Sequence, residues 1–293
     1  MTAALKITDL HIDIRTRNGT HSIVNGINLT LERGRIHGLA GESGSGKTMT
    51  ALAILGLLPE TMTASGSIVL SDVGEDRAGG VELVDASRQT YGAIRGRRIA
   101  MVFQDPSTSL HPQIPVGKQL TDHLRYHLKV NKHDARDRAI SLLDRVSVPD
   151  PEGALKKFPH QFSGGQRQRI AIAVALACDP DVLLADEPTT ALDVTVQAGV
   201  LQLLRDLVDD IGLSVLLVTH DLGVMSAVAD DVTVMRAGVV VESAPRRQLF
   251  TVPEHEYTKA LLAAMPGSTL EGSLDDLVEG LFERPSHRPE ESQ

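Results

Sequence analysis

Apolar and polar positions alternate along the first 40 residues, as in half-buried β-strands. A near-alternating run covers residues 5–14, the turn pair Asn18-Gly19 follows, and a second apolar series extends over residues 23–31. A period of two places every second side chain on one face of a sheet, and Asn-Gly is a favoured hairpin turn. These patterns predict two strands, and the short apolar stretch 36–40 predicts a third.

The next part of the chain mixes helical and β patterns. Residues 47–58 predict a helix that ends before Pro59, because proline cannot donate within a helix interior. Residues 66–104 return to β character, with a polar, glycine-rich loop at 71–80. Residues 116–176 have helical spacing and predict a mostly helical subdomain. Its expected core-facing residues are Leu120, Leu124, Leu128, Ile140, Leu142, Leu143 and Val146.

Alternation of strands and helices resumes near residue 180. The runs 182–185 and 215–218 are continuously apolar, which suits strands buried on both faces of a parallel sheet. A helix over 196–208 is expected between them. Residues 232–241 predict a closing hairpin, and 257–265 predict a last helix.

A phosphate-binding motif follows the third predicted strand. Residues 41–48 read GESGSGKT and match G-x-x-x-x-G-K-[ST]. The glycines let successive backbone N–H groups point into one hollow at a helix N-terminus, while Lys47 reaches the β- and γ-phosphates. A plain glycine-serine turn is the alternative, but the flanking strand and helix favour the motif. The expected nucleotide contacts are Gly41, Ser43, Gly44, Ser45, Gly46, Lys47, Thr48 and Thr50.

Three polar residues stand at the ends of the later apolar strands. Asp186 and Glu187 follow the run 182–185, and His220 follows the strand expected at 214–219. Open α/β sheets bind ligands at the carboxyl ends of their strands. We therefore expect Asp186 to hold Mg²⁺ together with the Thr48 hydroxyl, and Glu187 to polarise the water that attacks the γ-phosphate. Solvated side chains at strand ends are the alternative.

A second helix start with exposed N–H groups occurs at residues 162–166, which read FSGGQ. Ser163 is a favourable N-cap residue. This stretch is similar to the L-S-G-G-Q signature of the ABC (ATP-binding cassette) ATPases, with Phe162 in place of leucine. The chain resembles that family over about residues 5–265. Gln104 resembles its Q-loop glutamine, residues 191–193 its D-loop, and residues 219–221 the region of its switch histidine.

The resemblance implies an α/β fold: a P-loop NTPase (RecA-like) core, an antiparallel β subdomain and an inserted α-helical subdomain that carries the signature. We expect the ATPase domain at 1–265, with the core at about 1–104 and 180–250 and the helical subdomain at about 105–179. A C-terminal extension would cover 251–293, and its polar end, 284–293, is expected to be disordered.

The resemblance also assigns roles to residues. Lys47, Gln104, Glu187 and His220 would serve ATP hydrolysis, and Thr48, Gln104 and Asp186 would serve Mg²⁺. In this family two cassettes pack head to tail. The residues that would contact the ATP of the other subunit are Ser163, Gly164, Gly165, Gln166 and Asp193.

The adenine partner is not obvious from the sequence. The family stacks the base on an aromatic residue upstream of the P-loop, yet the first Phe, Tyr or Trp of this chain is Tyr91. His21 offers an imidazole ring in the first strands, so we expect His21, or an aliphatic side chain such as Ile14, to pack on the base.

Several stretches resemble the ATPases of dipeptide, oligopeptide and nickel importers: residues 41–48, 102–112 and 185–197, and a tail at 253–262 similar to HPYT-x-x-LL. This branch implies two membrane permease subunits, a second and different ATPase chain, and an extracytoplasmic solute-binding protein. Residues 101–103 and 105–116 would form the groove for a membrane subunit's cytoplasmic helix. Many members hold an iron–sulfur cluster in a cysteine-rich loop, and with Cys178 alone we expect none here.

Composition and charge disfavour several other classes of protein. Lys and Arg number 29 against 38 Asp and Glu, a net charge of −9, and nucleic-acid binding usually needs a basic face. With one P-loop and no sustained heptads, a soluble cassette acting on DNA or ribosomes is disfavoured, and the importer-like tail disfavours an exporter.

Residues 1–10 lack the apolar region of a signal peptide, and no apolar run approaches the ~20 residues of a spanning helix. We expect the chain at the cytoplasmic face of the membrane, held by its permeases. The membrane subunits and the binding protein would select the solute, for which we expect a di- or oligopeptide, with nickel or another metal chelate as the alternative.

Overall fold

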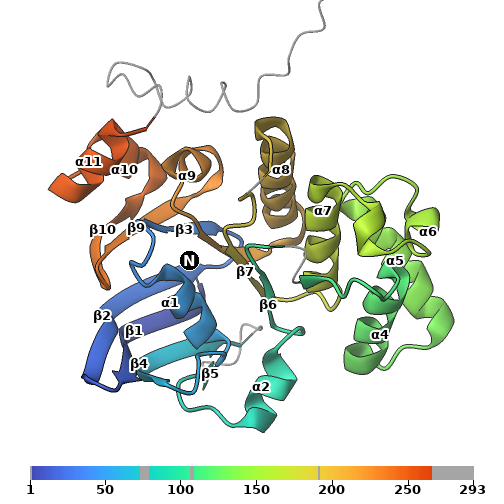
Figure 1. Ribbon diagram of the computed structural model, residues 1–293, viewed down its shortest axis with the longest axis horizontal. Coiled ribbons are helices and arrows are strands. Elements are labelled where there is room, and N and C mark those ends of the chain that lie inside the picture. Colours follow the sequence, from blue (N-terminus) through green and yellow to red (C-terminus); the bar gives the residue numbers. More distant parts are fainter. Residues whose placement is uncertain (1, 73–78, 106–108, 191, 266–293) are drawn as a thin grey trace, which may run out of the picture.

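The structure is a computed structural model that describes residues 2–72, 79–105, 109–190 and 192–265. Several expectations therefore fall wholly or partly outside the described residues. Among them are the loop at 71–80, the groove segment 105–116, Ala191 of the D-loop-like segment, the C-terminal extension at 251–293 and its disordered end at 284–293. Elsewhere the chain forms two sheets and a group of helices (Figure 1).

The first sheet is antiparallel and has the order β2-β1-β4-β5. Its strands are β1 (Ala3–Thr16), β2 (Gly19–Glu32), β4 (Met62–Ser71) and β5 (Gly80–Glu82). Most apolar residues of β1 and β2 face inward, and Leu5 and Leu31 are fully buried. The register between β1 and β2 shifts several times, including between the pairs of Ile12 and Asp13. Such irregularities change which side chains point to a given face.

The second sheet contains six strands in the order β10-β9-β3-β8-β7-β6. These are β3 (Ile36–Gly41), β6 (Ile99–Val102), β7 (Val182–Asp186), β8 (Ser214–Val218), β9 (Asp231–Arg236) and β10 (Val239–Pro245). All pairs are parallel except β9 with β10, the predicted closing hairpin. Every residue of β3, β7 and β8 is buried, as their continuous apolar runs predict. Their carboxyl ends therefore share one edge of the sheet, where the phosphate loop and Asp186 lie.

The helix after the phosphate loop is shorter than expected. Helix α1 spans Lys47–Ile54 rather than residues 47–58. Gly56 then adopts a left-handed backbone with a φ of +60°, and the Tyr91 ring lies 2.3 Å from where its Cβ would stand. The Tyr91 ring, 35 residues further along the chain, thus packs against Gly56 just where α1 has ended. Tyr91 itself lies on α2 (Arg88–Ile94), a helix that the sequence pattern did not predict.

The helical group is α4 (Val116–Leu128), α5 (Lys132–Arg145), α6 (Pro151–Ala154), the 3-10 helix η1 (Pro159–Gln161) and α7 (Gly164–Ala175). Five of the predicted core residues are buried: Leu120, Leu124, Leu142, Leu143 and Val146. Leu128, the last residue of α4, and Ile140 of α5 are half-buried instead. Cys178, just after α7, is buried as expected, and burial raises the pKa of its thiol.

Four further helices follow the strands β7, β8 and β10 along the chain (Figure 1). They are α8 (Val194–Ile211), α9 (Leu222–Val228), α10 (Arg246–Thr251) and α11 (Glu256–Ala263). Helix α8 contains the predicted 196–208 segment, and α11 contains most of the predicted last helix. Across the described residues, no helix is both long enough and apolar enough to span a bilayer.

Candidate functional site

Two glycines give the phosphate loop its shape. Gly41 has a φ of +142°, and a Cβ there would stand 2.1 Å from the carbonyl oxygen of Met235. Gly46 has a φ of +103°, caps the start of α1, and leaves only 2.8 Å between a Cβ and the Val24 side chain. L-residues rarely adopt such angles. The loop can therefore curl between β3 and α1 only with glycine at these positions.

Lys47 is folded back against the loop that precedes it. Its Nζ donates to the carbonyl oxygens of Gly41 and Glu42, both at 2.8 Å, and to Oγ of Ser45 at 3.3 Å. The residue is only 5% exposed. Burial lowers the pKa of Lys47, and the negative charges of Glu187, Asp186 and Glu42 oppose that shift. The ammonium is thus surrounded by acceptors at the place where the motif expects phosphate oxygens.

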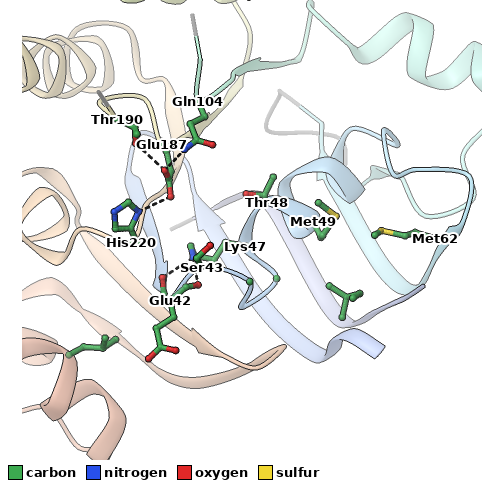
Figure 2. A pocket seen from close by; sticks show the side chains of 15 residues that line it. Glu42, Ser43, Lys47, Thr48, Met49, Met62, Gln104, Glu187, Thr190 and His220 are labelled. Carbon is green, nitrogen blue, oxygen red and sulfur yellow. Dashed lines mark hydrogen bonds and ion pairs between the residues drawn. The ribbon is translucent and has the colours of Figure 1, made fainter. Parts of the chain in front are cut away.

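The loop opens onto a cleft of roughly 870 Å³. In Figure 2, Glu42, Ser43 and Lys47 of the phosphate loop lie below the group formed by Gln104, Glu187, Thr190 and His220. The lining residues are Ile23, Gly41, Glu42, Ser43, Gly44, Gly46, Lys47, Thr48, Met49, Met62, Gln104, Glu187, Thr190, His220 and Leu261. A volume of this size is ordinary for a small-molecule site. Residues from seven separate parts of the chain therefore meet at one cleft.

Asp186 and Thr48 form a pair of oxygen donors beside the loop. The Thr48 hydroxyl donates to Oδ1 of Asp186 at 3.2 Å. Asp186 is 5% exposed, and burial raises its pKa against the lowering effect of that hydrogen bond and of Lys47. Carboxylate and hydroxyl oxygens are ligands that Mg²⁺ prefers. The residues present fit the predicted magnesium site.

The carboxylate of Glu187 has three partners (Figure 2). Oε2 accepts from Nε2 of Gln104 at 2.8 Å and from the Thr190 hydroxyl at 3.0 Å, and Oε1 lies 2.8 Å from Nδ1 of His220. Burial raises the pKa of Glu187, but the hydrogen bonds from His220 and Thr190 and the charges of His220 and Lys47 outweigh it. The net effect is a lowered pKa, so Glu187 is an ionised acceptor at neutral pH.

The backbone of Glu187 is also unusual. Its φ is +46°, in the left-handed region, and its N–H donates to the carbonyl of Val218 at 2.8 Å. A non-glycine residue seldom adopts this conformation, and its presence at a site is a recognised sign of a functional constraint. The sharp turn at the end of β7 directs the side chain toward Gln104 and His220.

Two residues expected to contact the nucleotide lie outside the cleft surface, and one residue that was not expected lies in it. His21 is exposed and is not part of the cleft wall, whereas Ile23 of the same strand is. The register shift between β1 and β2 near this point separates the two positions. Thr50 is fully buried and donates to the carbonyl of Gly46 at 3.0 Å, so it serves the start of α1 rather than the cleft surface. Thr190 was not singled out, although it follows Glu187 by only three residues.

The large apolar side chains that line the cleft are Ile23, Met49, Met62 and Leu261. Methionine is flexible and polarisable, and packs well against aromatic rings. Ile14 pairs with Met62 across β1 and β4 but does not itself line the cleft. A flat base can therefore rest on aliphatic and thioether groups here, without an aromatic residue.

The signature-like segment lies outside this cleft. Ser163 accepts from the N–H of Gln166 at 3.2 Å, and Gln166 accepts from the N–H of Ser163 at 3.1 Å, which forms a capping box at the start of α7. Gly165 packs so tightly that a Cβ would stand 2.3 Å from the Val196 side chain. Asp193 caps α8 by accepting from the N–H of Val196 at 3.0 Å. The signature-like segment and the start of α8 are therefore neighbours, while neither contributes to the cleft.

The fold and the cleft define a P-loop nucleotide-binding protein. The family model described as ABC transporter matches residues 24–190. The chain is 43% identical to the dipeptide transport ATP-binding protein of Bacillus subtilis (strain 168), over 99% of this chain and 86% of that one. It is 46% identical to the oligopeptide transport ATP-binding protein OppD of the same organism, over 93% and 74%. A solved ATP-binding cassette, described as the dimeric post-hydrolysis state bound to ADP and Pi, matches with a TM-score of 0.71 and 26% identity, over 83% of this chain and 99% of that one. The chain belongs to the ABC transporter family and is an ATPase subunit of that family.

Proposed function

We propose that this chain hydrolyses ATP to power a membrane importer of short peptides. The observation that carries the ATPase chemistry is the Glu187 carboxylate, held by Gln104, Thr190 and His220 across the cleft from Lys47. The solute class is supported by the names of the relatives, which are dipeptide and oligopeptide transport ATP-binding proteins.

The chemistry assigned to the cleft is in-line attack of water on the γ-phosphate of ATP. Lys47 and the N–H groups of the loop would bind the phosphates and offset the charge that builds up on them. Glu187, ionised because its pKa is lowered, would accept a hydrogen bond from the attacking water. His220 and Gln104 hold the two oxygens of that carboxylate in a fixed direction, so the water would be aligned before the reaction begins.

Thr48 and Asp186 are the residues we assign to Mg²⁺, with Gln104 on the same side of the cleft. When bound, Mg²⁺ would polarise the β- and γ-phosphate oxygens. Asp186 has to be ionised to bind the ion. Positive charge beside the carboxylate would counter the rise in its pKa that burial causes.

A second cassette would complete each site. Ser163, Gly164, Gly165, Gln166 and Asp193 stand away from the chain's own phosphate loop, so we assign them to the ATP of a partner subunit. We favour a second, different ATPase chain as that partner. Within each cassette of such a pair, we propose a core at about 1–104 and 180–250 and a helical subdomain at about 105–179.

A groove beside β6 suits a membrane partner. It measures roughly 230 Å³ and is lined by Leu55, Leu57, Arg95, Gly96, Ile99, Ala100, Met101, Val102, Phe103, Ser109, His123, Ala171, Val174 and Ala175. Leu57 and Phe103 are 41% and 38% exposed, which is high for large apolar side chains. Nε2 of His123 is buried without a hydrogen-bond partner. We assign this groove to a cytoplasmic helix of a permease subunit, with two such subunits and an extracytoplasmic binding protein in the full complex.

Affinity purification from gently solubilised membranes tests the transport assignment. The tagged chain should recover two multi-span membrane proteins and a second ATPase, identified by mass spectrometry. A Phe103→Glu variant should lose the membrane proteins but keep ATP binding, because it places a charge in the apolar groove. Tyr126→Glu, at a 70% exposed position outside the groove, is the matched control. Recovery of ribosomal proteins or nucleic acid instead would discard the importer.

A further inference from the structure

The last helix of the described chain touches the phosphate loop. Oη of Tyr257, in the first turn of α11, accepts a hydrogen bond from the backbone N–H of Glu42 at 3.3 Å. The two residues are 215 positions apart. Leu261, one turn further along α11, lines the same cleft as Glu42 and Lys47. One face of α11 therefore meets the nucleotide cleft.

The hydrogen bond acts on a single peptide group. The N–H of Glu42 and the carbonyl of Gly41 belong to the same peptide plane, because a peptide bond is planar. The carbonyl accepts from Lys47 at 2.8 Å, and the N–H donates to Tyr257. The peptide is thus held on one side by the lysine of the motif and on the other by α11. Gly41, with a φ of +142°, offers little resistance of its own to a rotation of this peptide.

The Tyr257 ring is itself held firmly. Tyr257 is 7% exposed, and the Arg236 guanidinium lies over its ring at 4.7 Å. Arg236 ends β9, the strand that pairs with β3 beneath the phosphate loop. Glu242 of β10 fixes the start of α11 by accepting from the N–H groups of Glu254 and His255 at 2.9 and 3.1 Å. Burial, joined by the adjacent Glu42 carboxylate, raises the pKa of Tyr257, so the phenol stays neutral at physiological pH.

We propose that Tyr257 is a positioning residue for the phosphate-binding loop, and that α11 is thereby a part of the nucleotide site. Tyr257 fixes the peptide between Gly41 and Glu42 with its carbonyl toward Lys47. This orientation keeps the entrance of the loop in the shape that receives the phosphates. The inference rests on the proposed binding of ATP at this loop, and it gives the segment after β10 a role that the cassette chemistry does not require.

The test compares Tyr257→Phe with the unmodified full-length chain. Phenylalanine keeps the ring and its contact with Arg236 and removes only the hydroxyl. We expect the KM for MgATP to rise two- to tenfold, the fold-change that corresponds to one net hydrogen bond, and kcat to change less than twofold. Hydrogen exchange of the Glu42 amide in nucleotide-free protein should accelerate in the variant, because its acceptor is gone.

One control variant and one measurement on the unmodified chain complete the test. Tyr126→Phe removes a hydroxyl from a 70% exposed tyrosine on α4 and should change neither readout. A Tyr257→Phe protein with normal KM and normal Glu42 exchange overturns the proposal, even if its melting temperature falls, because the tyrosine would then be only structural. If the unmodified chain itself fails to bind MgATP, the proposed function fails as well, and the two failures are told apart by that measurement.

Discussion

Nδ1 of His220 lies 2.8 Å from Oε1 of Glu187, although the two residues are 33 positions apart. A carboxylate can only accept a hydrogen bond, so this ring nitrogen carries the proton. The contact joins the ends of β7 and β8, two adjacent parallel strands. It fixes the direction of the carboxylate that faces the phosphate loop.

Replacing Glu187 by glutamine should abolish most turnover without preventing ATP binding. The amide has nearly the same shape but cannot polarise water, and the loss of such a group costs typically ~10²–10⁴-fold in rate. Steady-state phosphate release and MgATP titration measure the two quantities. Glu152→Gln on α6, an exposed position outside the cleft, is the matched control. Near-normal hydrolysis by the Glu187 variant would show that another group activates the water.

Thr190→Val should reduce kcat about two- to tenfold by removing one hydrogen bond to Glu187. That hydrogen bond helps to lower the pKa of Glu187. Without it the carboxylate keeps its proton to a higher pH, so the acidic limb of the kcat–pH profile should move upward. Thr251→Val, on α10, is the matched control and should leave the profile unchanged. If the acidic limb of the Thr190→Val profile does not shift, Thr190 does not lower the pKa of Glu187.

The stability of the protein should fall in mild acid because of His37. This side chain is 6% exposed and its Nε2 lies 2.8 Å from the Thr233 hydroxyl. Burial lowers the pKa of His37 from 6.5 to about 4. The unfolded chain therefore takes up a proton between pH 6.5 and about 4 that the folded chain refuses, so stability is lost as the pH falls through this window. The loss approaches roughly 3 kcal/mol at its lower end.

Denaturant unfolding at several pH values measures the contribution of His37. The difference in unfolding free energy between pH 7 and pH 5 should be smaller in His37→Gln than in the unmodified chain. His160→Gln, at an exposed position, should leave the difference unchanged. Equal pH dependence in all three proteins would mean that His37 titrates normally.

Gly41→Ala should destabilise the fold or distort the phosphate loop. The added Cβ would stand 2.1 Å from the Met235 carbonyl, at a backbone angle that alanine rarely adopts. We expect a loss of several kcal/mol in the free energy of unfolding, or a loss of MgATP binding where the loop yields instead. Gly92→Ala is the contrasting control, because nothing lies within 4 Å of its Cβ and it sits inside α2, where alanine should stabilise by about 0.5–1 kcal/mol. A Gly41→Ala protein with normal stability and normal nucleotide affinity would contradict the described loop.

Local patterns in the sequence were sufficient for most of the framework. The alternation in residues 5–31 predicted β1 and β2, and the continuous runs at 182–185 and 215–218 predicted two fully buried parallel strands. Once those strands were parallel, their carboxyl ends had to share one edge of the sheet. Asp186, Glu187 and His220 could therefore be grouped with the phosphate loop from the sequence alone.

Contacts between distant residues decided the rest, because no local spacing encodes them. The early end of α1 coincides with the approach of the Tyr91 ring to Gly56, and the hydrogen bond of Tyr257 to the phosphate loop spans most of the chain. A register shift, which a period-two pattern cannot reveal, brings Ile23 rather than His21 to the cleft wall. The sequence by itself thus determined which chemistry the strand ends carry, through composition and periodicity. Only the tertiary structure decided which side chains complete the cleft, because that depends on how separate elements pack against one another.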